Sequence, residues 1–109
     1  MSRLKETTID VAKDFSDMPY GRSSVDNEFN GEAFRKGPLL KALHEYEIVV
    51  VDLTGVMGSG SSFLDEAFAG LIKYEGYSYE EITRRLQFKS KYKSVLNNIE
   101  RYLREAKSK

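Results

Sequence analysis

The sequence predicts a single α/β domain in which a small mixed sheet of about four strands packs against helices. The uninterrupted β-branched run Ile48–Val51 is typical of a strand that is covered on both faces. Segments with the apolar spacing of helices precede and follow this run, and such an alternation favours a layered α/β fold. The length of 109 residues suits one domain, which we expect to span 1–109 with a core from about 8 to 106.

The composition excludes several classes of protein. Lys plus Arg and Asp plus Glu both number 17, so no overall basic field would recruit nucleic acid. The chain has no cysteine, which excludes disulfides and thiolate metal sites. No apolar run approaches the roughly 18 residues of a membrane span, and the N-terminus has no apolar leader segment. We therefore expect a cytoplasmic protein with no membrane contact, no cofactor and no metal.

The charges are unevenly distributed along the chain. Residues 1–78 carry 8 basic and 13 acidic side chains, a net charge of −5, whereas residues 79–109 carry 9 and 4, a net charge of +5. This division indicates either two partner-facing surfaces or two halves that attract each other. The second is the commoner case.

The N-terminal part predicts a strand, a long loop and a helix. Ile9 and Val11 alternate with polar neighbours, as in a half-buried strand. Residues 16–31 are rich in Pro, Gly, Ser and Asn, which indicates a long loop that is either functional or disordered. Residues 31–46 have helical spacing, and Pro38 within them predicts a kink or the start of a second helix.

The C-terminal part predicts three helices and a strand. Residues 61–76 form an amphipathic helix whose interior Gly70 costs about 1 kcal/mol relative to Ala, which suggests a close approach to another backbone. Residues 78–81 have a capping-box pattern that opens a short helix. Residues 87–93 alternate as in an edge strand, and the stripe from Val95 to Ala106 predicts a final helix.

One stretch, residues 52–67, has a pattern that could carry chemistry. A buried strand, a Gly/Ser turn and a helix place Ser61 and Ser62 at a helix N-terminus, where free N–H groups and the positive end of the helix dipole gather. Together with Gly58 and Gly60, these serines are candidates for anion or partner binding, and both serines are candidates for phosphorylation. The plainer alternative is that both serines only cap the helix.

Enzymatic readings of the same stretch are weaker, and we expect no catalysis. A phosphate-binding P-loop would need a lysine where Ser61 stands. A nucleophilic serine would need a base, and the only histidine, His44, lies in a helical segment where it is packed or solvated. The acids Asp52, Asp65 and Glu66 could converge on a metal, but the last two are adequately explained as complements of the helix dipole.

Four motifs of the chain are shared with a known family: Pro19–Arg22, Gly31–Arg35, Val51–Val56 and Ser61–Phe68. On these motifs, the span from Phe15 to about Tyr102 resembles the bacterial family described as STAS-like domains of unknown function. The strand–turn–helix from Val51 to Leu64 also resembles, more distantly, that of the STAS anti-sigma-factor antagonists.

The resemblance implies a STAS-like fold and a regulatory module that exchanges protein partners. In the antagonists, the first serine of the pair is phosphorylated by an ATPase of histidine-kinase fold. By position that serine is Ser61, with Gly60 where the antagonists have Asp. The alternative is a constitutive scaffold, or a module that binds a small anion or nucleotide without phosphorylation.

Two arginines near the predicted loop are further candidates for contact with an anion or partner. Arg22 and Arg35 could each form bidentate bonds to an anion or an acidic protein. The alternative is that each pairs with a nearby acid, namely Asp26, Glu28 or Glu32.

The basic strand supports a different kind of partner. Lys89, Lys91 and Lys93 alternate with Phe88 and Tyr92, a mixture that can hold single-stranded nucleic acid. In a strand, however, the aromatic side chains would face the core and the lysines would face solvent. We therefore expect a protein partner rather than nucleic acid, and the sequence leaves the oligomeric state open.

Overall fold

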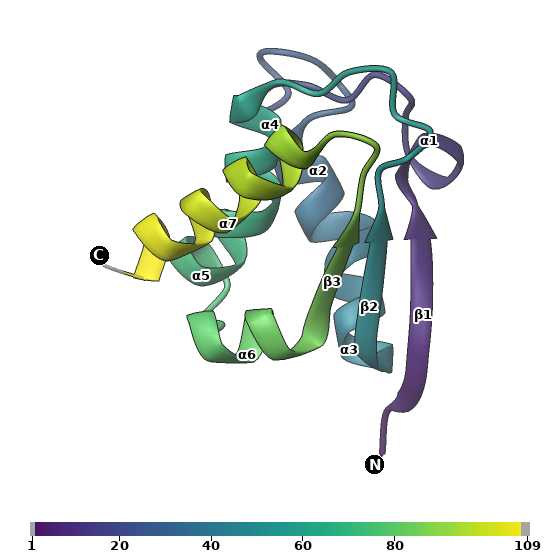
Figure 1. Cartoon of the computed structure of the whole chain (residues 1–109), viewed down its shortest axis with the longest axis vertical. Coiled ribbons are helices and arrows are strands. Elements are labelled where there is room, and N and C mark those ends of the chain that lie inside the picture. The colour runs from purple at the N-terminus through teal and green to yellow at the C-terminus, as the bar shows by residue number, and fades with distance from the viewer. Residues whose placement is uncertain (1, 108–109) are drawn as a thin grey trace.

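The structure is a computed structural model that describes residues 2–107, and its centre is a sheet of three parallel strands (Figure 1). The strands are β1 (Leu4–Asp10), β2 (Tyr46–Asp52) and β3 (Leu86–Lys89), in the order β1-β2-β3. In the register of the sheet, Val51 lies between Ile9 and Phe88. The α/β class is therefore confirmed.

The prediction of a mixed sheet of about four strands is wrong for the described residues. Each strand is joined to the next by a helical crossover, and a crossover brings the chain back to the same end, so all strands run parallel. The predicted strand at 87–93 is also shorter, because it ends at Lys89 and a helix begins at Lys93. Val11, expected in the first strand, instead starts the short helix α1 (Val11–Asp14).

Two long helical segments each contain one wide π turn. The first comprises α2 (Gly31–Phe34), η1 (Arg35–Leu39) and α3 (Leu40–Glu45), and the second comprises α4 (Ser61–Leu64), η2 (Asp65–Ala69) and α5 (Gly70–Tyr74). Pro38 lies in η1, so the expected break is a π turn without interruption of the helix. Helices α6 (Tyr79–Arg85) and α7 (Lys93–Lys107) complete the described chain.

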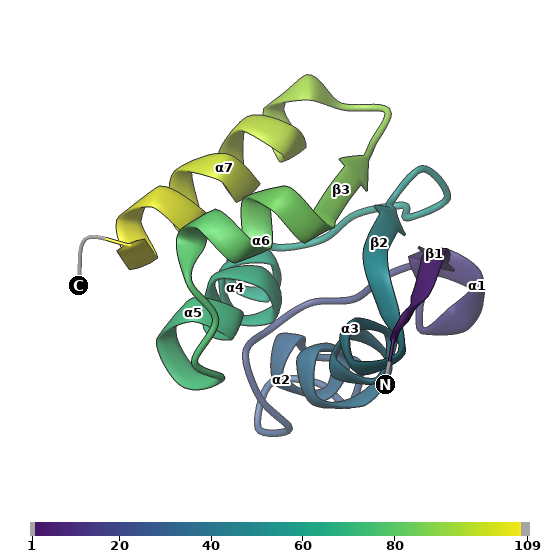
Figure 2. The same ribbon diagram turned by 90° about the horizontal axis from the view of Figure 1, so that it is seen from below.

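The helices cover one face of the sheet. Figure 2 looks along the strands, with α2 and α3 on one side of them. In Figure 1 no helix crosses in front of the sheet, so the expectation that β2 is covered on both faces is wrong. Val50 is nevertheless only 4% exposed, and its partners on the adjacent strands are Thr8 and Gln87.

The core between the sheet and the helices is rich in phenylalanine. Phe34, Phe63 and Phe68 are completely buried, and their rings contact one another edge-on or tilted. Phe68 also reaches Phe88 of β3, with 4.9 Å between ring centroids. This core fixes the two long helical segments against the sheet, and thereby the loops that join strands to helices.

Two glycines lie where the two helical segments pack against each other. A Cβ at Gly31 would lie 2.9 Å from the carbonyl oxygen of Phe63, so α2 and α4 approach each other backbone to backbone at this point. The close approach expected at Gly70 is of another kind. The atoms that fill the space beside Gly70 belong to the guanidinium of Arg35, a side chain rather than a backbone.

Candidate functional site

The carboxyl ends of the three strands lie at one end of the molecule, and the loops that follow them meet there (Figure 1). We call this region the loop end. It contains the turn after β1, the 16–30 segment, the 53–60 loop before α4 and the 90–92 turn before α7. The backbone N–H of Met57 donates to the carbonyl of Asp17 at 2.7 Å, which ties the 53–60 loop to the 16–30 segment.

The two candidate serines begin the helical segment that follows β2, but neither of them caps it. The N-cap is Gly60, whose carbonyl accepts from the N–H groups of Phe63 and Leu64. Ser61 is exposed and Ser62 is half-buried. Neither hydroxyl has a hydrogen-bond partner within residues 2–107. The plainer reading of both serines as caps is therefore wrong, and both hydroxyls are available.

A hollow of about 400 Å³ brings Arg22 and the serines together. The backbone around Arg22 is fixed, because its N–H donates to the Asp26 carboxylate at 2.9 Å and its carbonyl accepts from Glu32. The preceding Gly21 has a φ of +85°, a conformation that favours glycine, and its carbonyl accepts from Gly31. The hollow is lined by Tyr20, Gly21, Arg22, Asp26, Gly60, Ser61 and Ser62.

The guanidinium of Arg22 is only partly engaged. Its Nη1 donates to the Asp65 carboxylate at 2.9 Å and lies 3.8 Å from Glu66. The hydrogen bond with Asp65 raises the pKa of Arg22. The Nε and Nη2 groups have no hydrogen-bond partner in the described chain, and the side chain is 49% exposed. Arg22 therefore keeps donors for an anion in the hollow.

Asp65 holds Arg22 in place from the helix side. Burial raises the pKa of Asp65, but hydrogen bonds from Arg22 and Lys73 outweigh it, and the net pKa lies below its usual value. The Nζ of Lys73 is 3.1 Å from the carboxylate. Asp65 is thus a charged anchor for Arg22, a role beyond that of a complement to the helix dipole.

Arg35 belongs to the interior and not to a binding surface. Its side chain is 2% exposed, its Nη1 lies 2.8 Å from Glu66 and its Nε 2.9 Å from Glu75. It also packs over the ring of Tyr74, 5.1 Å from the ring centroid. The prediction that Arg35 contacts an anion or partner is therefore wrong, because its buried guanidinium lies between the carboxylate of Glu66 in η2 and that of Glu75 just after α5.

The alternative prediction, that both arginines pair with acids nearby in the sequence, is wrong about which acids they pair with. The guanidinium groups pair with Asp65, Glu66 and Glu75 rather than with Asp26, Glu28 or Glu32. The partners are 31 to 43 residues away in sequence, so no local pattern could have found them. Gly58 lies outside the Arg22 hollow and lines a second hollow at the loop end.

The other functional sites considered from the sequence are not formed by the described residues. His44 lies in the last turn of α3, before β2, and Ser61 follows β2 at its other end, a separation of roughly 20 Å along a seven-residue strand. Within residues 2–107, no three acidic or histidine side chains group as metal ligands would. No described helix has both the length and the apolar character needed to cross a membrane.

Comparison with known proteins gives one match. The family model of the STAS-like domain of unknown function matches residues 30–96, which is more than half of the chain. The chain belongs to this family. No curated protein and no solved structure matched at the required significance.

The STAS-like match covers only one side of the candidate site. It includes the 53–60 loop, both serines and Asp65, and it begins after Arg22 and most of the 16–30 segment. A STAS-like domain suggests a regulatory interaction module, while the description of the family leaves its function unknown. The partner and the control of binding are therefore matters for proposal.

Proposed function

We propose that this STAS-like domain is a non-catalytic regulatory module whose binding to a protein partner is switched by phosphorylation of Ser61. The observation that carries the proposal is the exposed Ser61 hydroxyl, which has no hydrogen-bond partner among residues 2–107 and opens on the same hollow as the unbonded donors of Arg22. The phosphoryl donor is ATP, and the transfer is catalysed by a serine-phosphorylating ATPase of histidine-kinase fold. The Oγ of Ser61 takes the γ-phosphoryl group, its proton is lost, and ADP leaves.

The site is suited to a phosphate after transfer. A phosphoserine at the first position of a helix lies at the positive end of the helix dipole, and Arg22 can donate to it through Nε and Nη2. The change replaces a neutral hydroxyl by about two negative charges close to Asp65 and Glu66. A partner that packs on the unmodified hollow would have to desolvate or repel this charge.

The surroundings of the hollow support a protein as the partner. Met18, Tyr20 and Met57 are large apolar side chains at the loop end, and each is more than half exposed. Exposed apolar side chains that gather in one place are typical of protein-binding surfaces. The hollow therefore lies beside a surface on which a protein could dock.

The proposal is tested by mapping phosphoserine in the domain recovered from its native host. We expect a phosphoryl group on Ser61, and its loss in Ser61→Ala. The matched variant Ser62→Ala should keep the modification, because the Ser62 side chain is half-buried. Absence of phosphate from both serines, with the ATPase and ATP supplied to the purified domain, would show that the switch does not exist.

A constitutive module that binds a small anion or nucleotide is the second candidate. It is favoured by the same free donors of Arg22, which could hold a phosphate group that is not attached to the protein. The Ser61→Ala variant distinguishes the two candidate functions. It would abolish a covalent switch, whereas reversible binding of an anion through Arg22 would remain intact.

A further inference from the structure

The loop end has an acidic half and a basic half. The acidic half follows β1 and contains the exposed carboxylates of Asp14, Asp17, Asp26 and Glu28, which outnumber its two exposed cations, Lys13 and Arg22. The basic half lies at the end of β3 and in the turn after it, and comprises the exposed Lys89, Lys91 and Lys93. None of these four carboxylates and three lysines forms an ion pair within residues 2–107.

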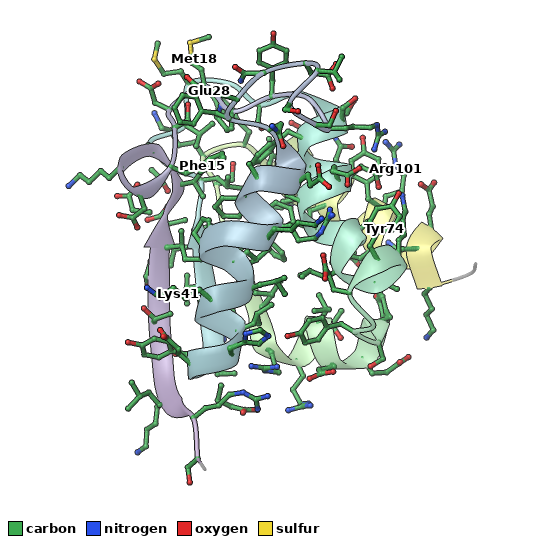
Figure 3. The ribbon with its side chains drawn as sticks, turned by 180° about the vertical axis from the view of Figure 1, so that it is seen from behind. Phe15, Met18, Glu28, Lys41, Tyr74 and Arg101 are labelled. Carbon is green, nitrogen blue, oxygen red and sulfur yellow. The ribbon has the colours of Figure 1, made fainter. Side chains whose placement is uncertain are left out.

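Apolar side chains lie within both halves. In the basic half, Met57 and Tyr92 border a hollow of about 260 Å³ between the 53–60 loop and the start of α7. These two side chains are 72% and 57% exposed. In the acidic half, Met18 is 59% exposed, and Figure 3 shows it at the loop end, as it does Glu28. One half thus offers an apolar projection and the other an apolar recess.

We propose that the loop end binds a second copy of this chain across a two-fold axis. A rotation about an axis that passes between the two halves places the acidic half of each copy on the basic half of the other. The same rotation brings Met18 of each copy to the hollow beside Tyr92 of the other. The surface is therefore complementary to itself in charge and in the placement of its apolar groups.

The charge pattern favours a second copy over the other occupants of this face. A nucleic acid would be attracted by the lysines and repelled by the four carboxylates beside them. A basic protein would match the carboxylates and leave the lysines facing like charge. A second copy neutralises both halves, and it does so with charges of opposite sign from the two parts of the sequence. This inference does not require phosphorylation of Ser61, and the second copy would compete with the partner of the proposed function for Met18 and Met57.

Charge-swapped variants test the proposal by sedimentation velocity at low ionic strength. The acidic half is changed by Asp17→Lys with Glu28→Lys, and the basic half by Lys91→Glu with Lys93→Glu. The side chains of all four residues are exposed and make no hydrogen bond within the described chain. The wild-type chain is expected to sediment as a dimer that dissociates as salt is added, because salt screens exposed charges.

Each swapped variant alone should self-associate at least about tenfold more weakly than wild type, since like charges then face each other. An equimolar mixture of the two variants should dimerise again, because their faces are complementary. The control Lys41→Glu with Glu105→Lys changes exposed residues outside the loop end and should leave the dimer intact. A monomeric wild-type chain at low ionic strength would overturn the proposal. So would a mixture that stays monomeric.

Discussion

Replacing Arg35 by methionine is expected to lower the free energy of unfolding by about 3 kcal/mol. The guanidinium is 2% exposed and bonds to the carboxylates of Glu66 and Glu75, which are themselves 13% and 19% exposed. Methionine fills much of the space but leaves both carboxylates without this cation. Breaking a buried pair from one side is costly because the remaining charge has lost its compensation.

Urea unfolding of two further variants separates this cause from a general loss of packing. Combining Arg35→Met with Glu66→Gln and Glu75→Gln removes the uncompensated charges and should recover a large part of the lost stability. The control is Lys36→Met, at the residue that follows Arg35 in the chain. It breaks an exposed ion pair with Glu32 and should lower the free energy of unfolding by less than about 1 kcal/mol. If Arg35→Met unfolds at the same urea concentration as Lys36→Met, the buried pairing does not hold the two segments together.

Gly31→Ala is expected to destabilise the domain by about 1–3 kcal/mol. The added methyl group would meet the Phe63 carbonyl and the Cβ of Glu66 at 2.9 and 2.7 Å, so α2 and α4 would have to separate. Separation would also disturb the hydrogen bond from Gly31 to Gly21, which holds the backbone beside Arg22. The substitution therefore affects both the core and the hollow.

The matched control for this substitution is Gly37→Ala in the same helical segment. A Cβ at Gly37 meets no atom within 4 Å, and alanine is a better helix former than glycine by about 1 kcal/mol. Gly37→Ala should therefore raise the thermal unfolding temperature, while Gly31→Ala lowers it. Equal effects of the two alanines would contradict the close approach of α2 and α4.

The parts of the fold that could be predicted from sequence are those with a local signal. The run Ile48–Val51 lies in β2, and the apolar spacing of residues 61–76 corresponds to the helical segment 61–74. The N-cap at Ser78 is also confirmed, since its hydroxyl accepts from the N–H of Glu81 at 3.0 Å. The reciprocal bond of a capping box is not formed within the described residues, because the Glu81 carboxylate pairs with Arg85 instead. In each case the residues that determine the element are neighbours in the chain.

The number and direction of strands could not be predicted in this way. Strand direction depends on the crossovers as a whole, and the expectation of about four strands had no fourth segment with a clear alternating pattern. The alternation at 87–93 predicts one strand, although residues 90–92 form a turn and Lys93 begins α7. Alternation over a few residues does not distinguish a strand from a polar turn that carries lysines.

The candidate site was found in part. The glycine–serine turn correctly located the start of a helix, but its pattern did not show that Gly60 is the cap and that both hydroxyls are free. The sequence offers Arg22 and Arg35 equally as candidates for contact with an anion or partner. Only their tertiary ion pairs distinguish them. One guanidinium is buried between Glu66 and Glu75, and the other lies half-exposed in the hollow beside Ser61.

The most direct test of regulated binding compares proteins captured from the native host by wild type, Ser61→Glu and Gln87→Glu. The last variant adds the same charge at an exposed position on the open face of the sheet, away from the hollow. We expect one partner, identified by mass spectrometry, to be captured equally by wild type and Gln87→Glu and to be gained or lost with Ser61→Glu. Identical capture by all three would contradict control of binding through Ser61.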